Sequence, residues 1–150
     1  MKYLLPLLLV ALSFSSCAKK KAKKQAATDE EIIQEYIASH GLNAVATGSG
    51  LYYVIDSQGT GSACTGASTV TVAYTGYFTD DIPFEQSPAE GVQFPLEGVI
   101  PGWTEGIPYF REGGVGKLLI PSALGYGPNG NASIPPNTVL IFDVELIDVL

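Results

Sequence analysis

The single tryptophan of this chain, Trp103, lies in a short segment between two regions that resemble strands. It belongs to the run VIPGWTEG at 99–106, and an extended stretch at 94–99 leads into it. Pro101 followed by Gly102 is typical of a turn from a strand into a helix, because proline suits the first helical position. We therefore expect a short helix here, with Trp103 on the side that faces a β-sheet.

Aromatic and branched apolar residues recur on both sides of this segment. Few of the polar groups that ordinary catalysis uses accompany them. The set predicts an apolar pocket with aromatic walls and a few polar groups at its rim, which is the usual form of a site for a small ligand or a peptide. Its members are Tyr74, Phe84, Phe94, Val99, Ile100, Tyr126, Ile134 and Phe142.

The chain's length and charge limit what it can be. Its 150 residues, 46% of them hydrophobic, are enough for one domain with a core and extensions. All fifteen acidic residues lie beyond Gln25, where only Arg111 and Lys117 are basic. We do not expect this acidic domain to bind nucleic acid, since phosphate binding requires clustered Lys and Arg. The two cysteines and the single His40 offer no metal-ligand spacing, so we expect no metal site.

Residues 1–16 have the features of a secretory signal peptide. Lys2 precedes an apolar run at 4–12, and Ser15 and Ser16 stand directly before Cys17. The run is too short for a membrane-spanning helix of about 20 residues. The pattern resembles a bacterial lipoprotein signal, in which Cys17 becomes the lipidated first residue of the mature protein. A plain signal peptide with a chance cysteine is the alternative.

The next segment, 17–27, is predicted to be a lipid anchor followed by a basic tether. Its sequence after the cysteine, AKKKAKKQAA, has no apolar period. We expect its lysines to lie against an anionic membrane surface, because a basic patch strengthens a single acyl anchor. A merely solvated spacer is the alternative.

A helix is predicted at 28–39, within an N-terminal helical segment at 28–47. Thr28 and Glu31 have the spacing of a capping box, and His40 followed by Gly41 is a stop signal. We interpret His40 as a helix-end residue and not as a general base, because a helix C-terminus favours histidine. One face of the helix must be buried, against the domain that follows or against a second copy of the chain. That face consists of Ile32, Ile33, Tyr36 and Ile37.

From Gly48 onward the composition changes to that of strands, which defines a domain at 48–150. Strands are predicted at 51–55, 68–78, 115–121 and 138–150 from their β-forming residues and alternation. The stretch 124–136 contains three glycines and three prolines and is predicted to be a long loop. Cys64 lies between the first two strands and is expected to be a small, semi-buried residue without a disulfide partner.

Five motifs in this domain occur together in one order. Taken singly, each of their residues would fit a core or turn position equally well. Together they resemble the FKBP-type peptidyl-prolyl isomerases, over roughly 49–150. The motifs are VTVAYTGYF at 70–78, Phe84-Glu85, VIPGWTEG at 99–106, LGYG at 124–127 and IPPNTVLIFDVEL at 134–146.

The resemblance implies an α+β fold, in which a twisted antiparallel sheet of about five strands wraps around a short helix, preceded here by one N-terminal helix. Trp103 would form the floor of the pocket in that fold. The signal followed by a helix further resembles the FKBP-type lipoproteins of Gram-negative bacteria. The chain is therefore expected to be lipid-anchored in a Gram-negative cell envelope, with its domain in the periplasm.

Roles for individual residues also follow from the resemblance. The Ile100 N–H and the Tyr126 hydroxyl would donate hydrogen bonds to a bound peptide or macrolide inhibitor. Glu85 and Val92 stand where the family usually has Asp and an aromatic residue, so we expect weaker macrolide binding and modest activity. The implied catalytic residues are Tyr74, Phe84, Glu85, Trp103, Tyr126 and Phe142, and the implied substrate-binding residues are Val92, Val99, Ile100 and Ile134.

The activity implied is peptidyl-prolyl cis-trans isomerisation that assists the folding of exported proteins. The enzyme would remove water from an X-Pro amide and twist it in the aromatic pocket, so proline-containing and unfolded polypeptides are the expected partners. No bond to the substrate needs to form, and no nucleophile, metal or cofactor is expected. Two alternatives remain: a chaperone or peptide-binding module with little turnover, and a structural homodimer built on the N-terminal helix.

Overall fold

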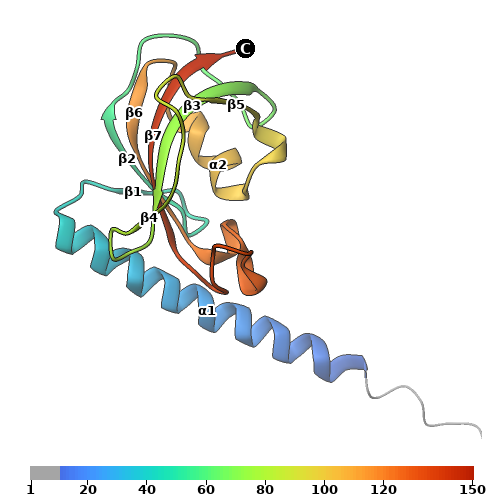
Figure 1. Cartoon of the computed structure of the whole chain (residues 1–150). Helices are drawn as coiled ribbons and strands as arrows, with labels where there is room; N and C mark the ends of the chain where they lie inside the picture. Colours follow the sequence, from blue (N-terminus) through green and yellow to red (C-terminus); the bar gives the residue numbers. More distant parts are fainter. Residues whose placement is uncertain (1–10) are drawn as a thin grey trace, which may run out of the picture.

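The computed structural model describes residues 11–150, so most of the predicted signal peptide lies outside the described residues. Residues 11–150 form two α-helices, seven strands and four short 3₁₀ turns (Figure 1). In chain order these are α1 (Ala11–His40), β1 (Val45–Ala46), β2 (Tyr52–Ser57), β3 (Thr69–Tyr77), β4 (Pro83–Gln86), β5 (Val92–Pro95), η1 (Leu96–Gly98), α2 (Pro101–Gly106), η2 (Ile107–Tyr109), β6 (Gly114–Ile120), η3 (Ser122–Leu124), η4 (Gly127–Asn129) and β7 (Leu140–Val149).

The seven strands form one antiparallel sheet in the order β1-β2-β6-β7-β3-β4, and β5 also pairs with β3. This arrangement around the short helix α2 confirms the predicted α+β class. The sheet has more than the expected number of strands because β1, β4 and β5 add edge pieces of two to four residues. The long strands β3, β6 and β7 make up its centre.

Each face of the central strands contributes to its own hydrophobic cluster, although Val115 and Glu145 on one of the faces remain exposed. Side chains alternate between the faces of a strand, so neighbouring residues on β6 and β7 enter different clusters. Leu118 and Phe142 pack on the side of α2, whereas Leu119 and Ile141 pack on the side of α1. We call these sides the α2 face and the α1 face.

The short helix α2 begins with Pro101 at its first position and lies very close to β6. A Cβ added to Gly102 would stand 2.6 Å from the side chain of Ile120, so only glycine allows this approach. Trp103 is 4% exposed and points toward the sheet, as predicted. The predicted extended stretch at 94–99 is wrong in part, because β5 ends at Pro95 and the 3₁₀ turn η1 intervenes, held by the bond from the Leu96 N–H to the Ser68 carbonyl at 2.9 Å.

The N-terminal helix is much longer than the sequence pattern predicted. It is already helical at Ala11, so Thr28 does not cap it, and the Thr28 hydroxyl instead donates to the Lys24 carbonyl one turn back, at 3.2 Å. The predicted tether is helical because alanine, lysine and glutamine all favour a helix even without an apolar period. Despite the length of α1, no helix among residues 11–150 has a stretch long and apolar enough to cross a bilayer.

The apolar face of α1 is covered by the domain of the same chain. Ile33 is fully buried and Tyr36 is nearly so, against Val54, Leu119 and Ile141. The domain of the same chain therefore covers this face, which is the first of the two predicted alternatives. The N-terminal end of α1, blue in Figure 1, extends beyond the domain.

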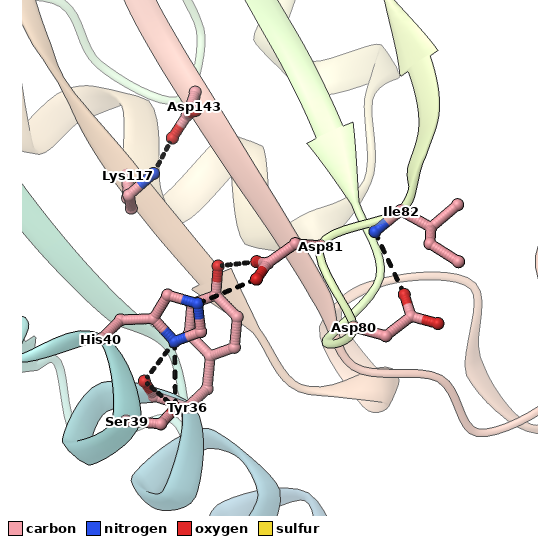
Figure 2. A network of polar contacts seen from close by, with 8 residues as sticks. All are labelled: Tyr36, Ser39, His40, Asp80, Asp81, Ile82, Lys117 and Asp143. Carbon is pink, nitrogen blue, oxygen red and sulfur yellow. Dashed lines mark hydrogen bonds and ion pairs between the residues drawn. The ribbon is translucent and has the colours of Figure 1, made fainter.

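At its other end α1 is tied to the turn before β4 (Figure 2). The His40 ring stacks on Tyr36 with centroids 3.9 Å apart, and its Nε2 lies 3.0 Å from Asp81 Oδ2. The Tyr36 hydroxyl donates to the other oxygen of Asp81 at 2.8 Å. His40 is thus the last residue of α1, as predicted, and it holds the turn that leads into β4.

Candidate functional site

A cavity of about 400 Å³ opens on the α2 face. This volume is within the range typical of small-ligand sites. The sequence predicted seven of its lining residues as site residues and Phe94 as part of the aromatic set, whereas Gly98 carried no signal in the sequence. The lining consists of Tyr74, Glu85, Phe94, Gly98, Val99, Ile100, Trp103, Tyr126 and Phe142.

Trp103 is surrounded by aromatic rings in edge-to-face contact. The Tyr74 ring is perpendicular to the indole with centroids 4.9 Å apart, and the Phe142 and Phe94 rings lie at 5.4 and 5.5 Å. Such pairs are stabilised by the quadrupoles of the rings as well as by their burial. The rings therefore hold one another in these orientations around the cavity.

Three predicted residues do not line this cavity. Phe84 packs behind it, with its ring centroid 5.6 Å from that of Phe142. Ile134 is buried in the core, and Val92 pairs with Val72 two positions before Phe94 on β5. Phe84 and Ile134 were expected to line the wall but support it from behind, and the short side chain of Val92 does not reach the cavity.

Gly76 on β3 makes room for two of these rings. A Cβ added there would lie 2.5 Å from the Phe84 ring and 2.8 Å from the Phe142 ring, much closer than real Cβ contacts. The glycine of the motif at 70–78 therefore has a packing role at the cavity wall.

The polar rim is built around a bond between β3 and β4. The Tyr74 hydroxyl donates to Glu85 Oε1 at 2.9 Å. Burial, together with this bond and the charge of Glu85, raises the pKa of Tyr74 to about 12, so its proton is retained near neutral pH. Burial, and then the charge of Glu85, also raises the pKa of Tyr126. Both hydroxyls are therefore neutral groups capable of donating hydrogen bonds.

Ile100 stands at the N-cap of α2, where its carbonyl accepts the N–H of Trp103 at 2.9 Å. The N–H of an N-cap residue has no acceptor within the helix, so the Ile100 N–H is available to a ligand in the cavity. The helix is held from outside by Thr104, whose hydroxyl donates to the Leu96 carbonyl at 2.5 Å. The buried Trp103 Nε1 has no hydrogen-bond partner among the described residues.

The segment that carries Tyr126 is ordered, although the sequence predicted only a long loop. Tyr126 lies between the turns η3 and η4, and the Asn137 N–H donates to the Gly127 carbonyl at 2.9 Å. Further along, the Asn131 side chain accepts the N–H groups of Ser133 and Ile134 at 2.8 and 2.7 Å. These bonds position Tyr126 at the edge of the cavity.

The site as a whole can bind an apolar ring and orient the carbonyl groups next to it. Its lining contains aromatic walls, one carboxylate, two phenol hydroxyls and a free N–H, but no pairing of a nucleophile with a base. Within residues 11–150 no three His, Cys, Asp or Glu side chains gather as the ligands of a metal ion would.

The sequence and the structure were compared with known proteins. The family model of the FKBP-type peptidyl-prolyl cis-trans isomerases matches residues 61–147. FkpA of Aeromonas hydrophila, an FKBP-type peptidyl-prolyl cis-trans isomerase, is 42% identical over 135 residues, which cover 87% of this chain and 50% of that protein. FkpA of Escherichia coli K12 is 41% identical over 140 residues, covering 89% of this chain and 51% of the relative.

Solved structures agree with these matches. The crystal structure of FkpA from Escherichia coli superposes with a TM-score of 0.73 at 41% identity, over 90% of this chain and 65% of that one. A peptidyl-prolyl cis-trans isomerase from Pseudomonas syringae pv. tomato superposes with a TM-score of 0.74 at 30% identity, over 85% and 94% of the two chains.

The chain spans about half the length of the FkpA relatives that it matches. The match to the family model begins in the loop between β2 and β3 and ends within β7. It includes every residue that lines the cavity. The chain belongs to the FKBP-type peptidyl-prolyl cis-trans isomerase family.

Proposed function

We propose that this chain is an active peptidyl-prolyl cis-trans isomerase that acts on proline-containing segments of polypeptides. The observation that carries the proposal is the cavity, which has Trp103 as its floor, aromatic rings as its walls and hydrogen-bonding groups at its rim. Membership of the isomerase family supports the same activity. The size of the cavity suits a prolyl ring and the residue before it.

The chemistry requires only what this cavity contains. Rotation about an X-Pro amide has a barrier of about 18–20 kcal/mol, because the planar amide is stabilised by resonance. Water stabilises the charge-separated planar form, so transfer of the amide into an apolar site lowers the barrier. Binding the twisted form more tightly than the planar one by about 4 kcal/mol would accelerate rotation about a thousandfold.

Each lining group has a place in this proposal. The prolyl ring would lie on Trp103, and the Ile100 N–H and the Tyr126 hydroxyl would donate to carbonyls of the bound peptide. Glu85, held by the Tyr74 hydroxyl, would stand beside the twisted carbonyl. Without an aromatic residue at Val92 that side of the cavity is less enclosed, and we propose that macrolide inhibitors bind weakly for this reason.

The test is the rate of cis-to-trans isomerisation of a proline-containing tetrapeptide with the purified full chain. We expect clear acceleration, and a loss of at least about tenfold in kcat/KM in Phe94→Ala, because a wall of the cavity is removed. Tyr109→Ala is the control, since Tyr109 stacks on Tyr53 and does not line the cavity. A folded wild-type chain that leaves the rate at its uncatalysed value would refute the proposal.

A second candidate function is a chaperone or peptide-binding module with little turnover. The replacement of the usual Asp by Glu85 favours it, because one carboxylate oxygen of the longer side chain already accepts the hydrogen bond from the Tyr74 hydroxyl. This candidate predicts that the wild type and Phe94→Ala suppress the aggregation of an unfolded protein equally well. Proline-containing and unfolded exported proteins are the proposed partners in either case.

We also propose that the chain is lipidated at Cys17 and held in a Gram-negative cell envelope, with its domain in the periplasm. The signal-like residues before Cys17 and the lysines after it support this, as does the exposure of Cys17. Labelled fatty acid should be incorporated into the wild type and into Cys64→Ser, since Cys64 is buried, but not into Cys17→Ser. Persistent labelling of Cys17→Ser would overturn the lipid anchor.

A further inference from the structure

A second hollow lies outside the cavity, between α1 and the segment that carries η3 and η4. Its volume is about 610 Å³, larger than that of the cavity. Ala18, Ala22 and two lysines of α1 form part of one wall, and Gly127 and Pro128 form part of the other. We call it the α1 groove. Its small side chains leave room for an extended polypeptide backbone.

The two walls of the groove are held together by a buried polar contact. Asp29 of α1 is 1% exposed and Ser122 of η3 is 2% exposed. The Asp29 Oδ2 atom accepts the Ser122 N–H at 2.8 Å and the Ser122 hydroxyl at 2.6 Å, while Oδ1 accepts the Gln25 side chain at 2.8 Å. Hydrogen bonds to a buried carboxylate are among the stronger ones in proteins. The two walls of the groove are therefore joined at the end where Asp29 meets Ser122.

Of the seven Lys and Arg residues at 11–150, five lie at 19–24 of α1, and two of these five line the groove. Lys21 and Lys24, three residues apart and so on one side of the helix, belong to its lining. No ion pair among residues 11–150 involves the five lysines at 19–24. The rest of the domain is acidic, so an acidic segment of another polypeptide is attracted here and repelled elsewhere.

The linings of the groove and of the cavity include neighbouring residues of one segment. Tyr126 lines the cavity, and the next residue, Gly127, lines the groove. We propose that the α1 groove binds an extended acidic segment of the same polypeptide whose proline occupies the cavity. This inference rests on the proposed function. It names a class of substrate, namely polypeptides in which an acidic stretch lies some residues away from a proline.

The chain provides a matched pair of variants for the test. Lys21→Glu/Lys24→Glu reverses the two lysines of the groove. Lys20→Glu/Lys23→Glu makes the same change of charge at the same spacing, on lysines that do not line it. An anionic membrane attracts lysines on any side of the helix, so the comparison separates a groove from a general charge effect.

Catalysis is measured at low salt with the full chain on three substrates. These are a proline tetrapeptide, a peptide of about 20 residues with glutamates on both sides of its proline, and the same peptide with glutamines. We expect KM to be about fivefold lower for the glutamate peptide than for the glutamine peptide in the wild type and in Lys20→Glu/Lys23→Glu. The difference should vanish in Lys21→Glu/Lys24→Glu and at high salt, with the tetrapeptide unaffected throughout.

Several results would overturn the inference. These are the absence of a glutamate preference in the wild type, its equal loss in both double variants, and binding of anionic vesicles but not of the glutamate peptide. If the wild type does not isomerise even the tetrapeptide, the proposed function fails, and fluorescence polarisation of the labelled glutamate peptide then decides the groove by itself. Binding that is lost only in Lys21→Glu/Lys24→Glu would keep the groove as a peptide site.

Discussion

The two faces of the sheet are built from the same strands, yet the cavity lined by aromatic rings lies on only one of them among the described residues. On the α1 face a helix of 30 residues, Ala11–His40, buries the cluster around Ile33, while Val115 and Glu145 further along the strands stay exposed. On the α2 face the covering helix has only six residues and leaves the edges of several rings uncovered. The comparison teaches that the site exists because the element over that face is too short to close it.

The faces meet at the turn between β3 and β4. Asp81 in that turn is held by Tyr36 and His40 of α1, and Glu85, four residues later, is at the rim of the cavity. Contacts on the α1 face thus hold the turn that leads to Glu85, the rim residue on the α2 face. Variants matched across the two faces separate stability from catalysis.

The largest effect is expected for Trp103→Ala, on the α2 face. Loss of the buried indole should destabilise the fold by about 3–5 kcal/mol and lower kcat/KM by at least about 100-fold, since the floor of the cavity is removed. Urea unfolding and the tetrapeptide assay measure the two effects. Retention of near-normal activity in a folded Trp103→Ala would contradict the assignment of the site.

Ile33→Ala is the matched change on the α1 face. Ile33 is fully buried, so we expect a loss of about 2–5 kcal/mol, comparable with that of Trp103→Ala. At a temperature where the variant remains folded, its kcat/KM should stay within about twofold of the wild type, since the cavity is on the other face. A large loss of activity there would mean that the two faces are coupled.

Gly76→Ala should have an intermediate effect, because a new methyl group would displace the Phe84 and Phe142 rings. Overpacking of this kind costs about 1–3 kcal/mol, and we expect about a tenfold fall in kcat/KM as the wall shifts. Thermal unfolding and the tetrapeptide assay test this. An unchanged kcat/KM would show that the rings can move without altering the site.

Two tyrosines of β3 form a finer pair. Tyr74 donates to Glu85 on the α2 face, and Tyr77 donates to Asp143 at 2.9 Å on the α1 face. Removal of either hydroxyl by substitution with phenylalanine should cost about 1 kcal/mol of stability. Only Tyr74→Phe should also lower kcat/KM, by about threefold, and equal activity in both variants would exclude a role for the Tyr74–Glu85 bond.

The smallest effect concerns the pH dependence of the His40–Asp81 contact. The bond to Asp81, and then the bond to the Tyr36 carbonyl, raise the pKa of His40 above its ordinary 6.5, while desolvation and then Lys117 oppose this rise. The bond to His40 in turn lowers the pKa of Asp81 below its ordinary 3.8. The stabilisation of the fold by protonated His40 is complete below pH 6.5. It is lost as the pH rises through the raised pKa of His40. The same contact weakens when acid protonates Asp81.

The advantage of the wild type over His40→Gln in thermal unfolding should therefore be greatest between pH 3.8 and 6.5 and should shrink on either side. Activity at matched folded fractions should not follow this profile. A difference between the two chains that is independent of pH would show that only the stacking of His40 on Tyr36 stabilises the fold.

Much of the α2 face was predictable from local patterns. The turn at Pro101, the burial of Trp103 and the alternation of β3 all depend on neighbours in the sequence, and most of the lining residues belong to such motifs. Phe84, Ile134 and Val92 were placed at the cavity wall and are not there. Whether a side chain reaches a cavity or supports it from behind depends on the elements packed around it, which a motif does not record.

The extent of α1 was mispredicted for a different reason. Absence of an apolar period at 18–27 was interpreted as absence of structure, although alanine and lysine sustain a helix that is solvated on all sides. The choice between the domain and a second copy as the cover of Ile33 also remained open, since periodicity identifies an apolar face but not what covers it.

The sequence by itself determined the period of each strand, the short helix after Pro101, the family, and the aromatic character of the site, because these follow from residue type and local spacing. Only the tertiary structure decided that α1 covers the far face of the sheet and that Asp29 binds Ser122, 93 residues away. The tertiary structure likewise places α1 beside the segment with η3 and η4, and so forms the α1 groove. Contacts at such separations depend on how whole elements pack, and no local pattern encodes them.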